Sequence, residues 1–441
     1  MRRVKSGLWA LALLSSAGSA FAQADLSNYV SVGDSLAAGF SSGSLVVTHQ
    51  RNSVPALLAR QAGAAGFEQP TVSEPGIPVE LGLVTLSPLT IIAPKASEPG
   101  SPTNLTLARP YNNLAVPGAT SIDALETVTD DGGLHDLILR GLGTQVQQAT
   151  ALHPTFVTLW IGNNDVLGAA VNGQAIDGVT LVPAATFRQV YTQIVAALKA
   201  TGAPIVAANL PDVTSIPFVT TIPRVVVNPT TLKPVLVDGQ PVPLLGPNGP
   251  LPSGSYVTLG ASSFLAKGIG IPAGLGGTGA PLPDNVILDP TEMAMIRDRV
   301  ATNNLAIADI CATAQIPVLD ANAILREITN EGRDLGGVTL GGAFLTGGLF
   351  SFDGVHLTEL GYAILANEWI ALINKRGSQL PPVNLGPYFG LASSGGGEGG
   401  VRATAGRRVV ASGSAAAVPL FEFSEEAFQN LRALFPRLDR R

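Results

Sequence analysis

Short apolar segments alternate with helical segments along most of this 441-residue chain, and this order limits the fold more than any other feature. Strands that alternate with helices form a parallel sheet, because each crossover helix packs on a face of that sheet. The pattern therefore predicts an α/β fold with a mainly parallel central sheet. The predicted strands are residues 29–32, 156–161, 204–209 and 316–320, and the predicted helices include 55–61, 187–200 and 358–374.

Two long stretches interrupt this order, residues 41–110 and 216–285. They are rich in Pro, Gly, Val and Leu and show little periodicity outside one short helix. They are too apolar for plain disorder, which accompanies low hydrophobicity. Long loops in compact domains are usually binding loops or lids. We therefore expect two insertions packed around the functional face; the alternative is small β-hairpins with no role in a site.

The N-terminus has the pattern of an export signal. Arg2, Arg3 and Lys5 precede a short apolar run at 8–14, and a small-x-small cleavage motif ends at Ala22. This predicts a signal peptide over residues 1–22. The run is far shorter than the roughly 20 residues that span a bilayer, which disfavours a membrane anchor. We expect an exported protein, periplasmic or extracellular, with no stable membrane span after cleavage.

The C-terminal part is expected to be separate from the main domain, residues 23–385. Residues 386–441 contain the glycine-rich run 393–400, which is typical of a linker. Beyond it, residues 424–435 place apolar side chains on one helix face. We expect this helix to dock on the body of the protein; contact with an unknown partner is the alternative.

Charge, cysteine and histidine content exclude several classes of function. The net charge of −6 comes without a basic patch, so nucleic acid is not an expected partner. Cys311 is the only cysteine, which excludes an intrachain disulfide, and its helical context predicts a buried, inert thiol. His49, His135 and His153 lack metal-ligand spacing and are predicted to lie at the surface or in loops. No metal and no other cofactor is expected.

Ser35 and His356 are the candidates for nucleophilic catalysis. Ser35 directly follows a predicted strand, in Gly33-Asp34-Ser35, where open α/β sheets place their sites. A serine hydroxyl needs a base, and a neutral histidine suits that task. Asp353, three residues before His356, can hold the second imidazole nitrogen.

Two further motifs offer donors for an oxyanion. Asn164 follows the strand 156–161 in Gly-Asn-Asn-Asp, and its amide can donate a hydrogen bond at the same sheet edge. Gly118 can offer a backbone N–H at close approach, and the N–H of Ser35 is the third donor. Asp34 and Asp165 are expected to accept structural hydrogen bonds from loop N–H groups.

These motifs, in this order, resemble those of the SGNH (GDSL) hydrolase family. The resemblance covers residues 29 to about 374, without the two insertions or the C-terminal tail. It implies a flavodoxin-like, three-layer α/β/α sandwich. It also implies that Ser35 is the nucleophile, His356 the base and Asp353 the orienting acid, with Ser35, Gly118 and Asn164 as the oxyanion hole. Position 37 is alanine, which disfavours the Gly-x-Ser-x-Gly elbow of the larger α/β-hydrolase fold.

The expected activity is hydrolysis of carboxylic esters through an acyl-enzyme intermediate. The apolar insertions favour a small-molecule or lipid ester as substrate. The alternatives are a polysaccharide acetyl esterase, an inactive cell-envelope binding protein on the same scaffold, and a module of a larger assembly that uses the tail helix.

Overall fold

A parallel four-stranded sheet forms the centre of the computed structural model, which describes residues 24–85, 89–389 and 421–438. The strand order is β1-β4-β5-β12, and every neighbouring pair is parallel. The predicted α/β fold with a parallel central sheet is thus confirmed. The strands are β1 (Tyr29–Gly33), β4 (Phe156–Trp160), β5 (Ile205–Ala208) and β12 (Val318–Leu319).

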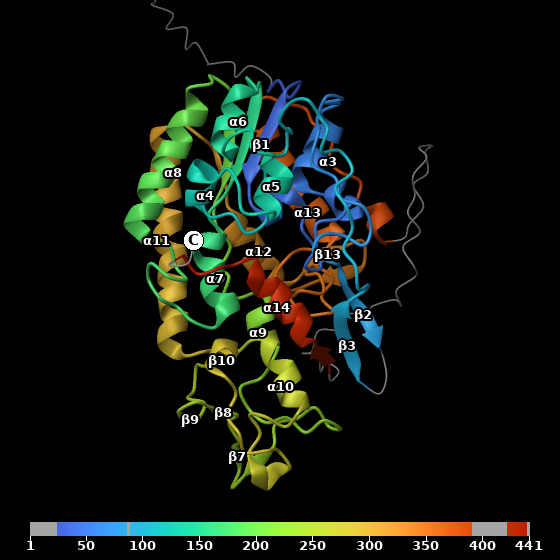
Figure 1. Ribbon diagram of the computed structural model, residues 1–441, viewed down its shortest axis with the longest axis vertical. Coiled ribbons are helices and arrows are strands. Elements are labelled where there is room, and N and C mark those ends of the chain that lie inside the picture. Colours follow the sequence, from blue (N-terminus) through green and yellow to red (C-terminus); the bar gives the residue numbers. More distant parts are fainter. Residues whose placement is uncertain (1–23, 86–88, 390–420, 439–441) are drawn as a thin grey trace, which may run out of the picture.

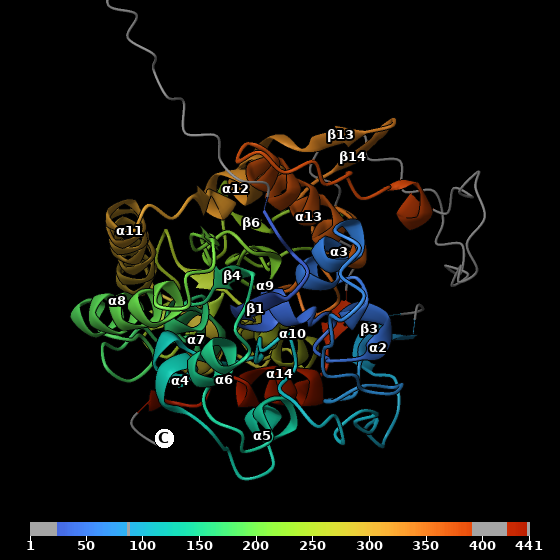
Figure 2. The ribbon, with the colours of Figure 1, turned by 90° about the horizontal axis from the view of Figure 1, so that it is seen from above.

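Helices cover both faces of this sheet, which explains why every residue of β1, β4 and β5 is buried. Figure 2 shows β1 and β4 between α4, α6 and α8 on one side and α3, α12 and α13 on the other. The helices on the first side are α4 (Ser121–Glu126), α6 (Gln145–Ala151) and α8 (Ala184–Lys199). A further helix, α11 (Pro290–Thr313), packs on α8. The second comprises α3 (Val54–Gln61), α12 (Ala321–Glu331) and α13 (Glu359–Asn374).

An irregular segment extends the sheet beyond β1. Asn113 bridges Ser31 in parallel, and the N–H groups of Leu114 and Val116 donate to the carbonyls of Ser31 and Gly33 at 2.9 and 3.1 Å. This pairing carries the chain to Gly118 beside the carboxyl end of β1.

The β-hairpin of the first insertion and most of the second insertion lie at the carboxyl end of the sheet, whereas α3 of the first insertion lies beside β1 (Figure 1). The first contains α2 (Val47–Gln50), α3, β2 (Leu81–Thr85) and β3 (Thr90–Pro94), of which the last two form an antiparallel hairpin. The second contains α9 (Pro217–Thr220), the short strands β6 (Leu236–Val237), β7 (Gln240–Pro241), β8 (Leu245–Gly246), β9 (Gly249–Pro250) and β10 (Tyr256–Val257), and α10 (Ser262–Ala266).

The remaining elements connect these layers. They are α1 (Ser35–Ala38), α5 (Leu134–Leu139), α7 (Asn164–Asn172), β11 (Ile287–Leu288), which pairs with β10, and the hairpin of β13 (Arg333–Leu335) and β14 (Val338–Leu340). None of the helices in the described ranges is long and apolar enough to cross a bilayer.

Residues 421–438, here called the C-terminal segment, return to the body of the protein. They contain β15 (Phe421–Phe423) and α14 (Glu425–Ala433). β15 pairs in parallel with β3, and α14 packs on β3 and α7 (Figure 1). The predicted docking of this helix is therefore confirmed. The predicted signal peptide (1–22) and the glycine-rich run (393–400) lie outside the described residues.

His49 and His135 correct the prediction that the three spare histidines lie at the surface or in loops. The side chain of His49 in α2 is only 14% exposed, and its nitrogens contact Glu80 at 3.1 Å and Glu359 at 3.2 Å. His135 is buried in α5 and contacts Asp130, whereas His153 is exposed in a loop as predicted. Local spacing gave no sign of Glu80 and Glu359, because they come from distant parts of the chain.

The ion pairs of His49 tie the first insertion to α13. Burial alone lowers the pKa of His49, but hydrogen bonds and charges from Glu359 and Glu80 outweigh it and raise the pKa to about 9. Lys95 also contacts Glu80, at 2.9 Å.

Replacement of His49 by Gln should therefore destabilise the protein in a pH-dependent way. The pKa of His49 in the folded state is raised above its usual value of about 6.5. At pH values below about 6.5 the ion pairs therefore contribute their full stabilisation to the folded state. Their contribution is lost as the pH rises through about 9. We expect His49→Gln to lower the free energy of unfolding by on the order of 1–3 kcal/mol at pH 6 and to match the parent at pH 10. Urea unfolding followed by circular dichroism measures this, with His153→Asn as an exposed control; an equal loss at both pH values would contradict it.

Candidate active site

Ser35 is fixed at the junction of β1 and α1. Asp34 caps α1 and its carboxylate accepts the N–H of Leu36, which makes Ser35 the first residue of the helix. A Cβ at Gly33 would lie 2.7 Å from the Ala37 Cβ and 2.8 Å from the Trp160 carbonyl oxygen. Glycine is therefore required there if the helix is to start this close to the sheet.

Asp353 and His356 form a pair within one loop. The Asp353 Oδ1 atom accepts the backbone N–H groups of Val355 and His356, both at 2.8 Å. Its Oδ2 atom lies 2.8 Å from His356 Nδ1. Since the carboxylate accepts a hydrogen bond from Nδ1–H, Nε2 is left as the basic nitrogen. In the part of the chain that the structure describes, Nε2 is buried and has no hydrogen-bond partner.

The carboxyl group of Asp353 is ionised over the physiological pH range. Burial by itself raises its pKa, because it disfavours the charged form. The charge of His356 and the hydrogen bonds from His356 and Val355 outweigh burial and lower the pKa to about 2. The pair therefore holds a permanent negative charge behind the imidazole.

The segment after Ser35 holds the loop of Asp353 and His356 in place. Ser41 Oγ donates to the Leu357 carbonyl at 2.9 Å, and the N–H groups of Ser42 and Gly43 donate to Ser351 Oγ and Asp353 Oδ2 at 2.8 and 2.7 Å. The Phe40 ring packs edge-on against the imidazole, with centroids 4.9 Å apart. The predicted serine and histidine are thus brought to one place by the first residues of the first insertion.

Sequence reasoning missed these supporting residues. The N–H of Gly43 and the hydroxyl of Ser351 act across about 310 positions of the chain. The only local signal was the position of Ser351, two residues before Asp353.

Gly118 and Asn164 lie next to each other, as expected for neighbouring oxyanion donors. Gly118 has a φ of 83°, a conformation that favours glycine. Asn164 is the first residue of α7, and its Nδ2 donates to the Ala119 carbonyl at 2.8 Å. An amide nitrogen has two hydrogens, so this bond fixes the side chain and leaves one hydrogen for an oxyanion.

Asp34 and Asp165 accept the structural hydrogen bonds that the sequence predicted. Asn163 donates to Asp34 through its backbone N–H at 3.3 Å and its Nδ2 at 2.8 Å, and Ser121 donates to Asp165 through its N–H and hydroxyl. Burial raises the pKa of Asp34 to about 6 and that of Asp165 to about 7, although these bonds act in the opposite direction. Asn163 thereby links the loop after β4 to the residue before Ser35.

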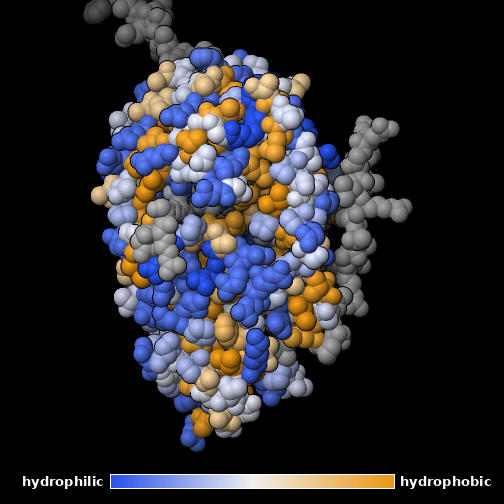
Figure 3. Space-filling model, viewed as in Figure 1, coloured by the Kyte–Doolittle hydropathy of each residue, from blue (hydrophilic) through white to orange (hydrophobic). Residues whose placement is uncertain are grey.

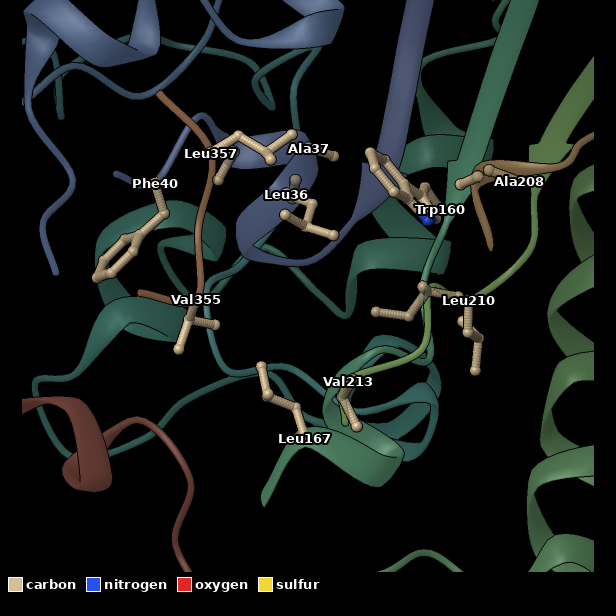
Figure 4. Packing of buried hydrophobic residues seen from close by; sticks show 14 of the residues in the cluster. Leu36, Ala37, Phe40, Trp160, Leu167, Ala208, Leu210, Val213, Val355 and Leu357 are labelled. Carbon is tan, nitrogen blue, oxygen red and sulfur yellow. The ribbon is translucent and has the colours of Figure 1, made fainter. Parts of the chain in front are cut away.

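Apolar side chains surround the site. Leu36, Phe40, Val355 and Leu357 come from the segments that carry Ser35 and His356, and Leu167 comes from α7 (Figure 4). Ser35 is 2% exposed and His356 is 1% exposed. The candidate site is therefore closed to solvent in this conformation.

No group of three or more His, Cys, Asp or Glu side chains within the described ranges is placed to hold a metal ion. Cys311 is buried in α11, as predicted, and burial raises the pKa of its thiol to about 11. The thiol is therefore protonated at neutral pH and inert.

A protein-family model matches most of this chain. The family model described as GDSL-like lipase/acylhydrolase matches residues 29–369. Among solved structures, the chain is similar to a protein assigned to the SGNH hydrolases from Slackia heliotrinireducens, with 14% identity, 78% of this chain and 97% of that chain covered, and a TM-score of 0.31. It is also similar to the lipase/acylhydrolase from Enterococcus faecalis, with 14% identity, 81% and 99% covered, and a TM-score of 0.34. No curated protein matches the chain.

Loss of the Asn163 side chain should destabilise the site through Asp34. Asn163→Ala leaves a buried carboxylate without its Nδ2 donor, which should lower the free energy of unfolding by about 1–3 kcal/mol. Because the pKa of Asp34 is about 6 and the variant raises it further, the loss should be larger at pH 8 than at pH 5. Urea unfolding at both pH values tests this, with the exposed Asn330→Ala of α12 as matched control. An equal loss of unfolding free energy at both pH values would show that Asn163 does not stabilise the charged form of Asp34.

Proposed function

The chain belongs to the family of GDSL-like lipases and acylhydrolases, and from this premise we propose that it cleaves carboxylic esters through an acyl-enzyme intermediate. The observation that carries the proposal is the buried Asp353–His356 pair, with Nδ1 held by the carboxylate and Nε2 unpaired. An imidazole held in this way is arranged to take a proton from a neighbouring hydroxyl.

The proposed reaction has two halves. In the first, Ser35 Oγ attacks the ester carbonyl carbon while His356 Nε2 takes the serine proton. The tetrahedral intermediate then expels the alcohol, which leaves with that proton, and the acyl group remains on Ser35. In the second half His356 takes a proton from water, the resulting hydroxide attacks the acyl-enzyme, and the acid is released as the proton returns to Ser35.

The oxyanion of each tetrahedral intermediate would be bound by the N–H groups of Ser35 and Gly118 and by the free amide hydrogen of Asn164. The Ser35 N–H lies at the N-terminus of α1. Gly118 and the Asn164 amide are held beside each other by the hydrogen bond from Asn164 Nδ2 to the Ala119 carbonyl. Donors fixed before the reaction stabilise developing charge without reorganisation.

The surroundings of Ser35 and His356 favour lipid or short-acyl esters as substrates. Leu36, Phe40, Val355 and Leu357 present hydrocarbon next to the two catalytic residues, and strand β2 exposes Leu83 and Val84. A polysaccharide acetyl esterase is the second candidate, and an inactive envelope-binding protein is the third. Ser35, Asp353 and His356 are all present, which argues against the third.

We further propose that the protein acts outside the cytoplasm. The support is the sequence of residues 1–22, with its basic start, short apolar run and small-x-small end. A substrate in the periplasm or outside the cell would then meet the enzyme.

Replacement of Ser35 by Ala should abolish ester hydrolysis. With the mature chain from Gln23 onward and p-nitrophenyl butyrate and palmitate as substrates, we expect kcat to fall by about 10⁴–10⁶ in Ser35→Ala. Ser253→Ala, at an exposed loop position, is the control and should keep full activity. Mass spectrometry after reaction with a fluorophosphonate should show one added phosphonyl group on Ser35.

Other results of these assays would favour one of the two alternative functions. Labelling of Ser35 without cleavage of either ester, together with activity on acetylated glycans, would support the polysaccharide acetyl esterase. The hydrolase proposal would be overturned if neither turnover nor labelling were found. This must hold in the parent and also in Phe428→Ala, the variant described below that loosens the C-terminal segment.

Asn164→Ala should slow the chemical step of the proposed reaction. Loss of one oxyanion donor should lower kcat by about 10²–10³ and leave KM nearly unchanged. Steady-state kinetics measure both constants, and Asn330→Ala again serves as the matched control. A rise of KM with unchanged kcat would place Asn164 in ground-state binding instead.

A further inference from the structure

The C-terminal segment lies directly over the oxyanion residues. The carbonyl oxygen of Leu434 is 2.5 Å from the position that a Cβ on Gly118 would take. Phe435 stands against α7, where a Cβ on Gly168 would be 3.8 Å from the Phe435 Cβ. A small cavity lined by Thr120, Asn164 and Phe435 is left between the segment and α7. The space next to the Asn164 amide is thus enclosed by the end of the chain.

Polar contacts fasten the end of the segment to α7 and the loop after it. Asn172 Nδ2 donates to the Phe435 carbonyl, and Arg432 Nε donates to Asn172 Oδ1, both at 3.1 Å. The N–H of Leu438 donates to the Val179 carbonyl at 2.8 Å. Since α7 begins with Asn164, these bonds hold the segment on the helix that supplies an oxyanion donor.

Aromatic packing joins the segment to the histidine loop. Phe428 stacks on Phe218 with centroids 6.3 Å apart, and it fits against Gly260, where a Cβ would lie 2.6 Å from its ring. The N–H of Phe218 in turn donates to the Gly354 carbonyl, between Asp353 and His356, at 2.8 Å. The segment is therefore packed on the second insertion where that insertion contacts the catalytic loop.

The start of the segment is fastened to the first insertion. β15 pairs with β3, the N–H of Ser424 donates to the Ile92 carbonyl, and Ser262 Oγ exchanges hydrogen bonds with Phe423. One short segment thus bridges both insertions and α7. Its outer face is hydrophilic and carries the exposed residues Glu425, Glu426 and Gln429 (Figure 3).

We propose that the C-terminal segment is an intramolecular cover, which occupies the ester-binding face and must leave it before substrate reaches Ser35. The inference rests on the proposed function, since it assumes that an ester enters beside Ser35, Gly118 and Asn164. It follows from the 2% and 1% exposure of Ser35 and His356 together with the position of the segment over the oxyanion donors. The segment is joined to the body through residues 390–420, so it stays attached after it leaves.

A reversible cross-link tests the cover directly. Gly168→Cys with Phe435→Cys places two Cβ atoms about 3.8 Å apart, the separation found in disulfides. The natural Cys311 is buried and does not interfere. We expect the oxidised protein to react with a fluorophosphonate and to cleave p-nitrophenyl butyrate at least tenfold more slowly than the same protein after reduction. Equal rates in the two states would overturn the cover and leave the hydrolase proposal intact.

A second measurement does not depend on catalysis. In a Ser35→Cys protein, alkylation by iodoacetamide, located by peptide mass spectrometry, reports access to position 35. Phe428→Ala, which loosens the segment, should speed this alkylation at least tenfold, whereas Gln429→Ala, on the exposed face of the same helix, should leave it unchanged. Faster alkylation, together with no fluorophosphonate labelling of Ser35 in the parent or in a Phe428→Ala protein that keeps Ser35, would support the cover and overturn the hydrolase proposal. The same alkylation rate in all three proteins would overturn the cover.

Discussion

The buried carboxylate of Asp353 accepts hydrogen bonds from the N–H groups of Gly43, Val355 and His356, from Ser351 Oγ and from His356 Nδ1. An ionised carboxylate inside a protein is stable only where donors replace the water that it has lost. These donors come from both sides of the site, since Gly43 belongs to the segment that follows Ser35. The same charge that fixes the imidazole therefore also holds the segment after Ser35 against the loop of His356, and Phe40 of that segment packs on the imidazole.

The sequence predicted the parts of this arrangement that depend on local order. The strands were readable because β1, β4 and β5 are buried on both faces and are therefore mostly apolar, with Ser31 and Thr158 as the polar exceptions. The spacing of Asp353 and His356 was readable because one turn holds both. The structure places Ser35 and His356 on adjoining segments and Gly118 beside Asn164, as the order of motifs suggested.

Contacts between distant segments left no such signal. The ion pairs of His49 depend on Glu80 and Glu359, which lie 31 and 310 positions away. The periodicity of residues 424–435 predicted an amphipathic helix and its docking, but the place of docking depends on surfaces made by Gly118, Gly260 and Phe218, far apart in the chain. A glycine that leaves room for another segment looks the same in sequence as a glycine in a turn. For that reason the docking place of the C-terminal segment could not be foreseen.

The pairing of β15 with β3 has a consequence for the integrity of the molecule. β3 lies between β15 and β2, so without the last residues of the chain it would be the open edge of a two-stranded ribbon. Unpaired strand edges recruit strands from other molecules, and loss of Phe423 and Phe428 would also uncover the ring of Phe218, which adds to the same tendency. A chain shortened after residue 389 would therefore present the edge of β3 to other molecules, whereas in the full chain residues 421–423 pair with that edge.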